Sequence, residues 1–415
     1  MNLKILKNRN FLLIALGGLI SALGTRMLTI CLSLYVLEET GSAGKFASVL
    51  AISIIPTILL GPIAGVLADN FNKKKILVFL DFLSGCIILY YCFNLSILKS
   101  LSINNIYILV ILLSIISAIY NPTTSSLLPH CIKKEDLMTG NGLLSMLFNL
   151  ANLVGPILGT SLFGFYGLFI VMLIDSISFF ISSFLELFIT IGYCKTHANI
   201  NIKSFISDFK QGLLYIKNKP ILLTILILGM VVNMVYSPIM SIGLNYITKI
   251  NLCISDYKIG ILNSIITLAT FLSPFLCSKI SKKLSLGKIL FGDILLQGIL
   301  FFILCIISSN IYIKLFDSNL IPYISIMVIG FFITLICCTG NLALTTIIQK
   351  QTPLSFMGRV QATLSSLLMI TTPIGQIIFG FLFDNFISSL CILVASVVFI
   401  ITIFILRKPL IASED

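Results

Sequence analysis

Two ionisable residues, Arg26 and Asp175, lie well inside long apolar stretches of the sequence, the runs 11–37 and 167–192. A charged side chain at the centre of a membrane-spanning helix costs about 2.5–3.5 kcal/mol, so such residues usually have a partner or a role. Both residues fall at a similar depth, in the outer half of the spans in the orientation derived below. The sequence predicts a buried ion pair, which relieves both costs, or alternatively a proton-coupling site.

Three more carboxylates, Asp81, Glu186 and Asp293, lie near the cytoplasmic ends of their apolar runs. Side chains at that depth can reach water, so we expect them to be interfacial. The two histidines, His130 and His197, fall in polar connections and form no cluster with acidic residues. The 11 cysteines follow no metal-binding spacing. We therefore expect no metal site, no cofactor and no enzymatic centre.

The composition is that of a polytopic membrane protein. The chain is 58% hydrophobic and 10% charged, with a mean hydropathy of +1.11, whereas soluble domains carry about 25% charged residues. A helix crosses the bilayer with about 20 residues. We predict an all-α fold with twelve transmembrane helices, at residues 11–37, 46–68, 76–94, 105–128, 139–164, 167–192, 220–248, 257–278, 288–309, 319–348, 360–383 and 387–406.

The distribution of basic residues predicts the orientation in the membrane. Most of the 27 Lys and Arg residues lie in clusters on one side of the predicted topology. The opposite side receives only Lys45, Lys99, Lys249, Lys258 and Lys314. Because basic loops stay in the cytoplasm, both termini are predicted to be cytoplasmic. The net charge of +12 therefore reflects topology, and no nucleic-acid partner is expected.

A central polar connection, residues 193–219, divides the chain into an N-terminal six-helix bundle, 1–192, and a C-terminal one, 220–415. Its segment 205–216 can form a short amphipathic helix on the inner membrane surface. Features recur between the halves with offsets of 212 or 213 residues, since Pro62, Lys75 and Asp81 have counterparts in Pro274, Lys288 and Asp293. The repeat predicts two pseudo-symmetric bundles.

The stretch Gly65–Lys75 joins the second and third apolar runs as a short basic hairpin. Residues matching the signature Gly-x-Leu-Ala-Asp-Arg-x-Gly-Arg-Lys-x-x-Leu are Gly65, Leu67, Ala68, Asp69, Lys73, Lys74 and Leu77. Asn70 and Asn72 depart from it. The stretch resembles the loop signature of the major facilitator superfamily, and otherwise reads as an ordinary basic hairpin.

That resemblance implies a role in conformational gating. We expect Asp69 to accept hydrogen bonds from the positive start of the helix near Gly358-Arg359. The expected gating residues are Gly65, Asp69, Lys73, Lys74, Gly358 and Arg359.

The fifth predicted span contains Gly155-Pro156-Ile157-Leu158-Gly159. It resembles the Gly-x-x-x-Gly-Pro-x-x-Gly antiporter signature of exporters in the same superfamily, with Ala151 in place of the first glycine. Small residues four apart permit close packing of the two halves, and the proline bends the helix. Resemblance implies export, while a generic helix crossing is the alternative.

The connections after the fourth and tenth spans, around Asn121-Pro122 and Gln349–Pro353, resemble the drug:proton antiporter branch that includes macrolide exporters and the enterobactin exporter. By that resemblance the first, fourth, seventh and tenth spans line a substrate cavity. Its candidate residues are Arg26, Tyr120, Asn121, Asn233, Tyr236 and Asn341. Core packing and helix capping are the alternatives for each.

These observations predict a secondary transporter that exports an amphipathic small molecule in exchange for protons by alternating access. We expect a monomer in the cell membrane whose partners are the substrate, protons and lipid. Two alternatives remain open. One is an importer of a metabolite or peptide on the same fold, and the other is a non-transporting membrane receptor or immunity protein.

Overall fold

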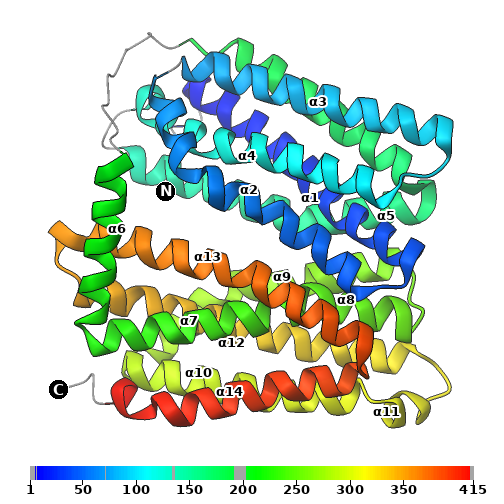
Figure 1. Cartoon of the computed structure of the whole chain (residues 1–415), viewed down its shortest axis with the longest axis vertical. Coiled ribbons are helices and arrows are strands. Elements are labelled where there is room, and N and C mark those ends of the chain that lie inside the picture. Colours follow the sequence, from blue (N-terminus) through cyan, green and yellow to red (C-terminus); the bar gives the residue numbers. More distant parts are fainter. Residues whose placement is uncertain (1–4, 6, 71, 133–135, 191–201, 412–415) are drawn as a thin grey trace. The chain divides into compact units, whose positions relative to one another are not determined.

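The computed structural model describes residues 5, 7–70, 72–132, 136–190 and 202–411, with side chains except at 61–70, 130, 138, 202–208, 354–355 and 408–411. The described residues are helical almost throughout and contain no strand. The first helices are α1 (Arg9–Thr40), α2 (Ala43–Asn70), α3 (Lys73–Leu98), α4 (Ile103–Cys131) and α5 (Leu137–Leu187) (Figure 1).

The later helices begin with α6 (Ile202–Lys217) and α7 (Pro220–Pro238). Beyond Pro238 the same rod continues through π-helical turns and α8 (Leu244–Tyr246) to Asn251. The remaining helices are α9 (Asp256–Ile280), α10 (Leu286–Ile307), α11 (Asn310–Lys314), α12 (Leu320–Gln351), α13 (Leu354–Asn385) and α14 (Ser388–Ile411).

In the described chain, 11 continuous helices are long and apolar enough to cross a membrane. One of them, α5, is interrupted at Gly167, whose φ of 76° and ψ of 179° are not helical, so it supplies two spans. Glycine adopts a positive φ without the clash that a Cβ would cause. The all-α fold with twelve predicted spans, including the break near residue 167, is confirmed.

The chain forms two compact units. The first contains Met1–Glu39 and Ile52–Ile202, and the second contains Thr40–Ala51 and Lys203–Asp415. The boundary after Ile202 falls within the predicted central connection. Placement of Thr40–Ala51 in the second unit differs from the predicted division, because the start of α2 binds the end of α13.

That contact is made by Asp384, on the last turn of α13. Its Oδ2 accepts hydrogen bonds from Ser42 Oγ at 2.7 Å and from the Gly44 backbone N–H at 3.0 Å. A carboxylate at a helix N-terminus satisfies otherwise unpaired N–H groups and complements the helix dipole. Gly44 is required for this approach, since a Cβ there would lie 2.6 Å from Asp384 Oδ2.

The two units repeat the same polar contact between helices. In the first unit, Ser176 Oγ of α5 donates to the Gly85 carbonyl oxygen of α3 at 2.9 Å. In the second, Ser396 Oγ of α14 donates to the Gly298 carbonyl oxygen of α10 at 2.7 Å. In an apolar environment a hydroxyl needs a partner within the protein, so these bonds hold neighbouring spans together. Gly85 and Gly298 are 213 residues apart, which matches the sequence repeat.

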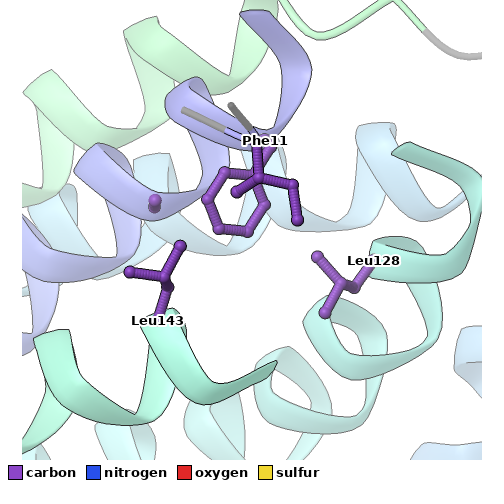
Figure 2. Packing of buried hydrophobic residues seen from close by; sticks show 5 residues of the cluster. Phe11, Leu128 and Leu143 are labelled. Carbon is purple, nitrogen blue, oxygen red and sulfur yellow. The ribbon is translucent and has the colours of Figure 1, made fainter. Parts of the chain in front are cut away.

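One end of the first unit is closed by a cluster around Phe11, which is fully buried. Phe11 of α1 packs against Leu128 of α4 and Leu143 of α5, together with Ile5 and Ala15 (Figure 2). Close packing of large side chains is a main source of helix association where lipid tails are as apolar as the protein. The cluster therefore fixes α1 relative to α4 and α5, the helices that carry much of the candidate site.

The central connection contains a helix, α6, close to the predicted segment 205–216. It packs against α13, a contact that the sequence did not predict. Gly212 lies against the Arg359 carbonyl oxygen, where a Cβ would approach within 2.7 Å. The rings of Tyr215 and Phe356 stack with centroids 5.2 Å apart, and Tyr215 Oη donates to the Gln351 carbonyl oxygen at 3.2 Å.

Candidate functional site

Asp81 and Glu186 lie close together inside the first unit. Asp81 is on α3 and Glu186 is at the end of α5, and each residue is only 1% exposed. The two carboxylates are near enough to interact electrostatically. Tyr120 of α4 donates from Oη to Glu186 Oε1 at 2.8 Å. The expectation that these carboxylates reach water is therefore wrong, because α1, α4 and their own helices cover them.

The packing around this pair depends on small residues. At Gly17 of α1 a Cβ would lie 3.0 Å from Ser182 Oγ and 3.8 Å from Glu186 Cγ. Ser183 Oγ donates to the Val78 carbonyl oxygen at 2.9 Å, which fixes α5 against α3. Within the described structure, Asp81 Oδ2 and Glu186 Oε2 have no hydrogen-bond partner. Both carboxyls thus retain a free binding position.

Two neighbouring buried carboxylates can bind and release a proton. Among the described residues, no Lys or Arg contributes to the electrostatic environment of either group. Like charges in one buried site repel each other, and a shared proton removes that repulsion. Loss of one partner's charge on protonation therefore changes the energy of the whole cluster. This is the chemistry that a proton-coupled process requires.

Asp175 and Arg26 do not form the predicted ion pair. Asp175 is fully buried, and its Oδ1 accepts from Ser178 Oγ at 3.3 Å while Oδ2 has no partner among the described residues. Its carboxylate packs against Gly24 of α1, where a Cβ would lie 3.1 Å from Asp175 Cγ. Arg26 leaves α1 about 200° away from Gly24. It is exposed, and its Cβ lies against Gly155.

A second polar centre lies inside the second unit, around Asp293 of α10. A cavity of about 50 Å³ is bounded there by α7, α10, α12 and α13. Asp293 is 7% exposed, and Gln297, one turn later, is fully buried. The Gln297 Nε2 group donates to Asp293 Oδ2 at 2.9 Å. Asp293 is therefore not interfacial as expected, since the neighbouring helices enclose it.

The candidate cavity residues separate into different places. Asn233 and Asn341 line the cavity around Asp293. Tyr236 donates to Thr334 Oγ1 at 3.1 Å in the same unit. In the first unit, Tyr120 turns inward to Glu186, whereas Arg26 and Asn121 are exposed. Their joint role in one substrate cavity stays a prediction.

Sequence reasoning missed Gln297 and Gly17. Gln297 follows Asp293 by four residues within an apolar run, a spacing that places both side chains on one face of a helix. That signal was available. Nothing in the sequence around Gly17 indicated that it faces a carboxylate on another helix.

The fifth-span motif packs α5 against α1 within the first unit. At Gly159 a Cβ would lie 2.8 Å from Met27 Cα, and at Gly155 it would lie 2.7 Å from Arg26 Cβ. Ala151 is fully buried, and Pro156 lies inside the helix. The expected contact between the two halves is replaced by a contact inside one unit.

The second unit has an equivalent contact between α13 and α7. At Gly375 a Cβ would lie 2.8 Å from Met234 Cα and closer still to the Met234 carbonyl oxygen. Pro373 precedes Gly375 within α13. In both units a glycine of a proline-containing helix thus lies directly on the backbone of the unit's first long span. This gives a structural basis to the looser sequence echo between residues 155–156 and 372–375.

The expected gating residues are only partly described. The side chains of Gly65 and Asp69 lie outside the described residues. Lys73 and Lys74 open α3, whose N-cap is Asn72, with the Asn72 side chain accepting from the Lys75 N–H at 3.2 Å. Gly358 and Arg359 lie in the second turn of α13, which begins at Leu354. The gating role stays a prediction.

Comparison with known proteins yields relatives that are transporters. Macrolide efflux protein A of Streptococcus pyogenes is 24% identical over 387 residues, which cover 89% of this chain and 88% of the relative. Multidrug efflux pump Tap of Mycobacterium tuberculosis is 24% identical over 237 residues, 55% of this chain and 56% of the relative. The crystal structure of a bacterial homologue of the iron transporter ferroportin has a TM-score of 0.70 at 16% identity, covering 95% of this chain and 98% of that one.

The sequence profile of the Major Facilitator Superfamily matches residues 14–365. This range includes both polar centres and both glycine contacts described above. The ferroportin-homologue structure shares the fold over nearly the whole chain. The protein is a multi-pass membrane protein that transports small molecules, and the chain belongs to the Major Facilitator Superfamily.

Proposed function

We propose that this chain exports amphipathic small molecules from the cell in exchange for protons. The observation that carries the proposal is the similarity to macrolide efflux protein A, which extends over 89% of this chain and 88% of the relative. Similarity to the multidrug efflux pump Tap supports the same direction. The partial antiporter motif, whose Gly155 and Gly159 pack on α1, agrees with export.

The substrate class follows from the polar residues available to bind it. Recognition of a phosphate or of several carboxylates favours more than one arginine. Arg26 is the only basic residue among the candidate cavity positions. Methionines such as Met230 and Met234 on α7 offer an adaptable apolar surface. We therefore expect neutral or weakly ionised amphipathic compounds, such as macrolides, as substrates.

The Asp81–Glu186 pair supports proton coupling. The titratable groups that face it are Tyr120 from α4 and Asp175 from α5. All of these groups are acidic, so nothing on the described elements neutralises the pair when both carboxyls are charged. Binding of one proton changes the energy of the cluster, and this change can bias the conformational equilibrium of the transporter. The exchanged proton is assigned to this pair.

Transport in inside-out membrane vesicles tests the proposal. With the lumen made more acidic, vesicles containing the protein should accumulate a macrolide, and a protonophore should abolish the effect. One proton exchanged per neutral molecule supports about a tenfold gradient for each pH unit, since a tenfold ratio corresponds to 1.4 kcal/mol. Vesicles without the protein correct for passive trapping of weak bases.

The outcomes distinguish the alternatives. Proton-dependent movement of a metabolite or peptide in the opposite direction would identify an importer and contradict the export proposal. Absence of movement for any compound in a chemically broad panel would favour a non-transporting receptor or immunity protein.

The proposed orientation can be tested by chemical labelling. Lys314 in α11 and Lys283 between α9 and α10 are both exposed, and they are predicted to face opposite sides of the membrane. In a cysteine-free background, Lys314→Cys should react with an impermeant thiol reagent in whole cells, whereas Lys283→Cys should react only after permeabilisation. The reverse pattern would contradict cytoplasmic termini.

A further inference from the structure

The cavity of about 50 Å³ in the second unit is separate from the Asp81–Glu186 pair, which lies in the first unit. Its polar lining consists of Asn233, Asp293, Gln297, Cys337, Gly340 and Asn341. These residues come from three helices, α7, α10 and α12. Leucine residues from the same helices and α13 supply much of the remaining wall.

Two buried oxygen atoms in this lining have no partner. The hydrogen bond from Gln297 Nε2 to Asp293 Oδ2 occupies the nitrogen of the amide and one oxygen of the carboxylate. Within the described structure, Asp293 Oδ1 and Gln297 Oε1 remain without a hydrogen bond. Leaving a buried polar atom unpaired is unfavourable, and more so for a charged group. Both atoms therefore favour a ligand that brings positive charge.

The surrounding helices add oxygen atoms and leave room for the ligand. Gly340 lets α12 approach the carboxylate, since a Cβ there would lie 2.5 Å from Asp293 Cγ and 2.9 Å from Oδ1. Asn233 and Asn341 bring amide groups from α7 and α12. The Asn341 nitrogen faces Cys337 Sγ at 3.8 Å, which leaves the amide oxygen for other contacts.

This combination indicates the class of ligand. The space suits a water molecule or a small ion and is far below the several hundred Å³ of an organic ligand site. Amide and carboxylate oxygens are the ligands that hard cations prefer. A single carboxylate supplies one negative charge, which one monovalent ion balances. We propose that this cavity binds one small monovalent cation, either sodium or a proton carried on water.

The groups that face Asp293 agree with this assignment. The titratable neighbours are Cys337 and Cys338 on α12 and Tyr236 on α7. None of them carries a positive charge in any protonation state. Among the described lining residues, no Lys, Arg or His occupies the position of the cation. The site is thus electrostatically uncompensated until a cation binds.

Thermal unfolding of the purified full-length protein tests the site. At constant pH and ionic strength, replacement of choline chloride by sodium chloride should raise the unfolding midpoint along a one-site saturation curve, because a ligand of the native state stabilises it. Asp293→Asn keeps the side-chain shape and should abolish the rise. Asn341→Ala removes one oxygen donor at an exposed position and should shift half-saturation to a severalfold higher sodium concentration.

A matched control is Asp317→Asn, which removes the same charge from an exposed residue between α11 and α12. Its sodium response should equal that of the wild type. If sodium has no effect but the midpoint depends on pH in a way that Asp293→Asn removes, the bound cation is a proton. If neither sodium nor pH distinguishes the wild type from Asp293→Asn and Asn341→Ala, the proposal is wrong. Because the measurement involves no transport, its result is independent of the export proposal.

Discussion

Replacement of Glu186 by Gln should abolish proton-driven efflux while downhill exchange of the same compound continues. The amide has the shape of the carboxyl, and its oxygen can still accept the hydrogen bond from Tyr120, so the packing is retained. What it lacks is a group that titrates next to Asp81. Without that group the pair no longer couples proton binding to the conformational equilibrium.

The effect is large because coupling is lost entirely. In vesicles with a lumen one pH unit more acidic, the wild type should sustain about a tenfold gradient of a neutral substrate per exchanged proton, whereas Glu186→Gln should sustain none. Exchange of labelled for unlabelled compound, measured without a pH difference, reports whether the variant still folds and moves substrate. Asp81→Asn should behave in the same way.

Two control variants separate coupling from general damage. Tyr120→Phe removes only the hydrogen bond to Glu186 and should weaken efflux without uncoupling it. Asp317→Asn removes an exposed carboxylate and should leave efflux unchanged. A Glu186→Gln protein that still builds a pH-driven gradient would show that the proton binds elsewhere, and Asp175 would be the next buried carboxyl to examine.

Substitution of Gly375 by Ala should destabilise the protein strongly for so small a change. The added methyl group would lie 2.8 Å from Met234 Cα and against the Met234 carbonyl oxygen, so it meets backbone that cannot rotate away. Helices α7 and α13 must separate to admit it. Overpacking of this kind costs about 1–3 kcal/mol. Gly159→Ala, which meets Met27 of α1, should have a similar effect in the first unit.

Each helix contains its own control glycine. Gly358 in α13 and Gly142 in α5 have no atom within 4 Å of a Cβ. Alanine at an unobstructed helix position is favoured over glycine by about 0.5–1 kcal/mol. Thermal unfolding in detergent should therefore show a lower midpoint for Gly375→Ala and Gly159→Ala and an equal or higher one for Gly358→Ala and Gly142→Ala. Equal midpoints for all four variants would contradict the close helix approach.

The two units use their shared architecture differently. Asp81 on α3 and Asp293 on α10 are 212 residues apart and follow the repeat, as do Gly85 and Gly298 on the same helices. The partner differs, because Asp81 is close to a second carboxyl, Glu186, whereas Asp293 bonds an amide, Gln297. The first arrangement doubles the negative charge and suits a proton. The second provides neutral oxygens around one charge and suits a cation.

The sequence by itself determined the spans, the repeat and the family. Long apolar runs must be helices in a membrane, because every backbone polar group has to be satisfied within the segment. Glycine at position 167 marked the break inside α5, and the residues 65–77 carried the family signature. These features are local, so they can be read without knowing how the helices pack.

Only the tertiary structure decided which ionisable side chains meet. Arg26 and Asp175 have matching depth and opposite charge, yet Asp175 packs against Gly24, on a different face of α1. Asp81, Glu186 and Asp293 lie near span ends, yet neighbouring helices bury them. The helical period determines which residues share a face, but the rotation of each helix about its axis depends on small-residue contacts such as those of Gly17, Gly159 and Gly375. Those contacts involve segments far apart in the chain, and a single sequence does not specify them.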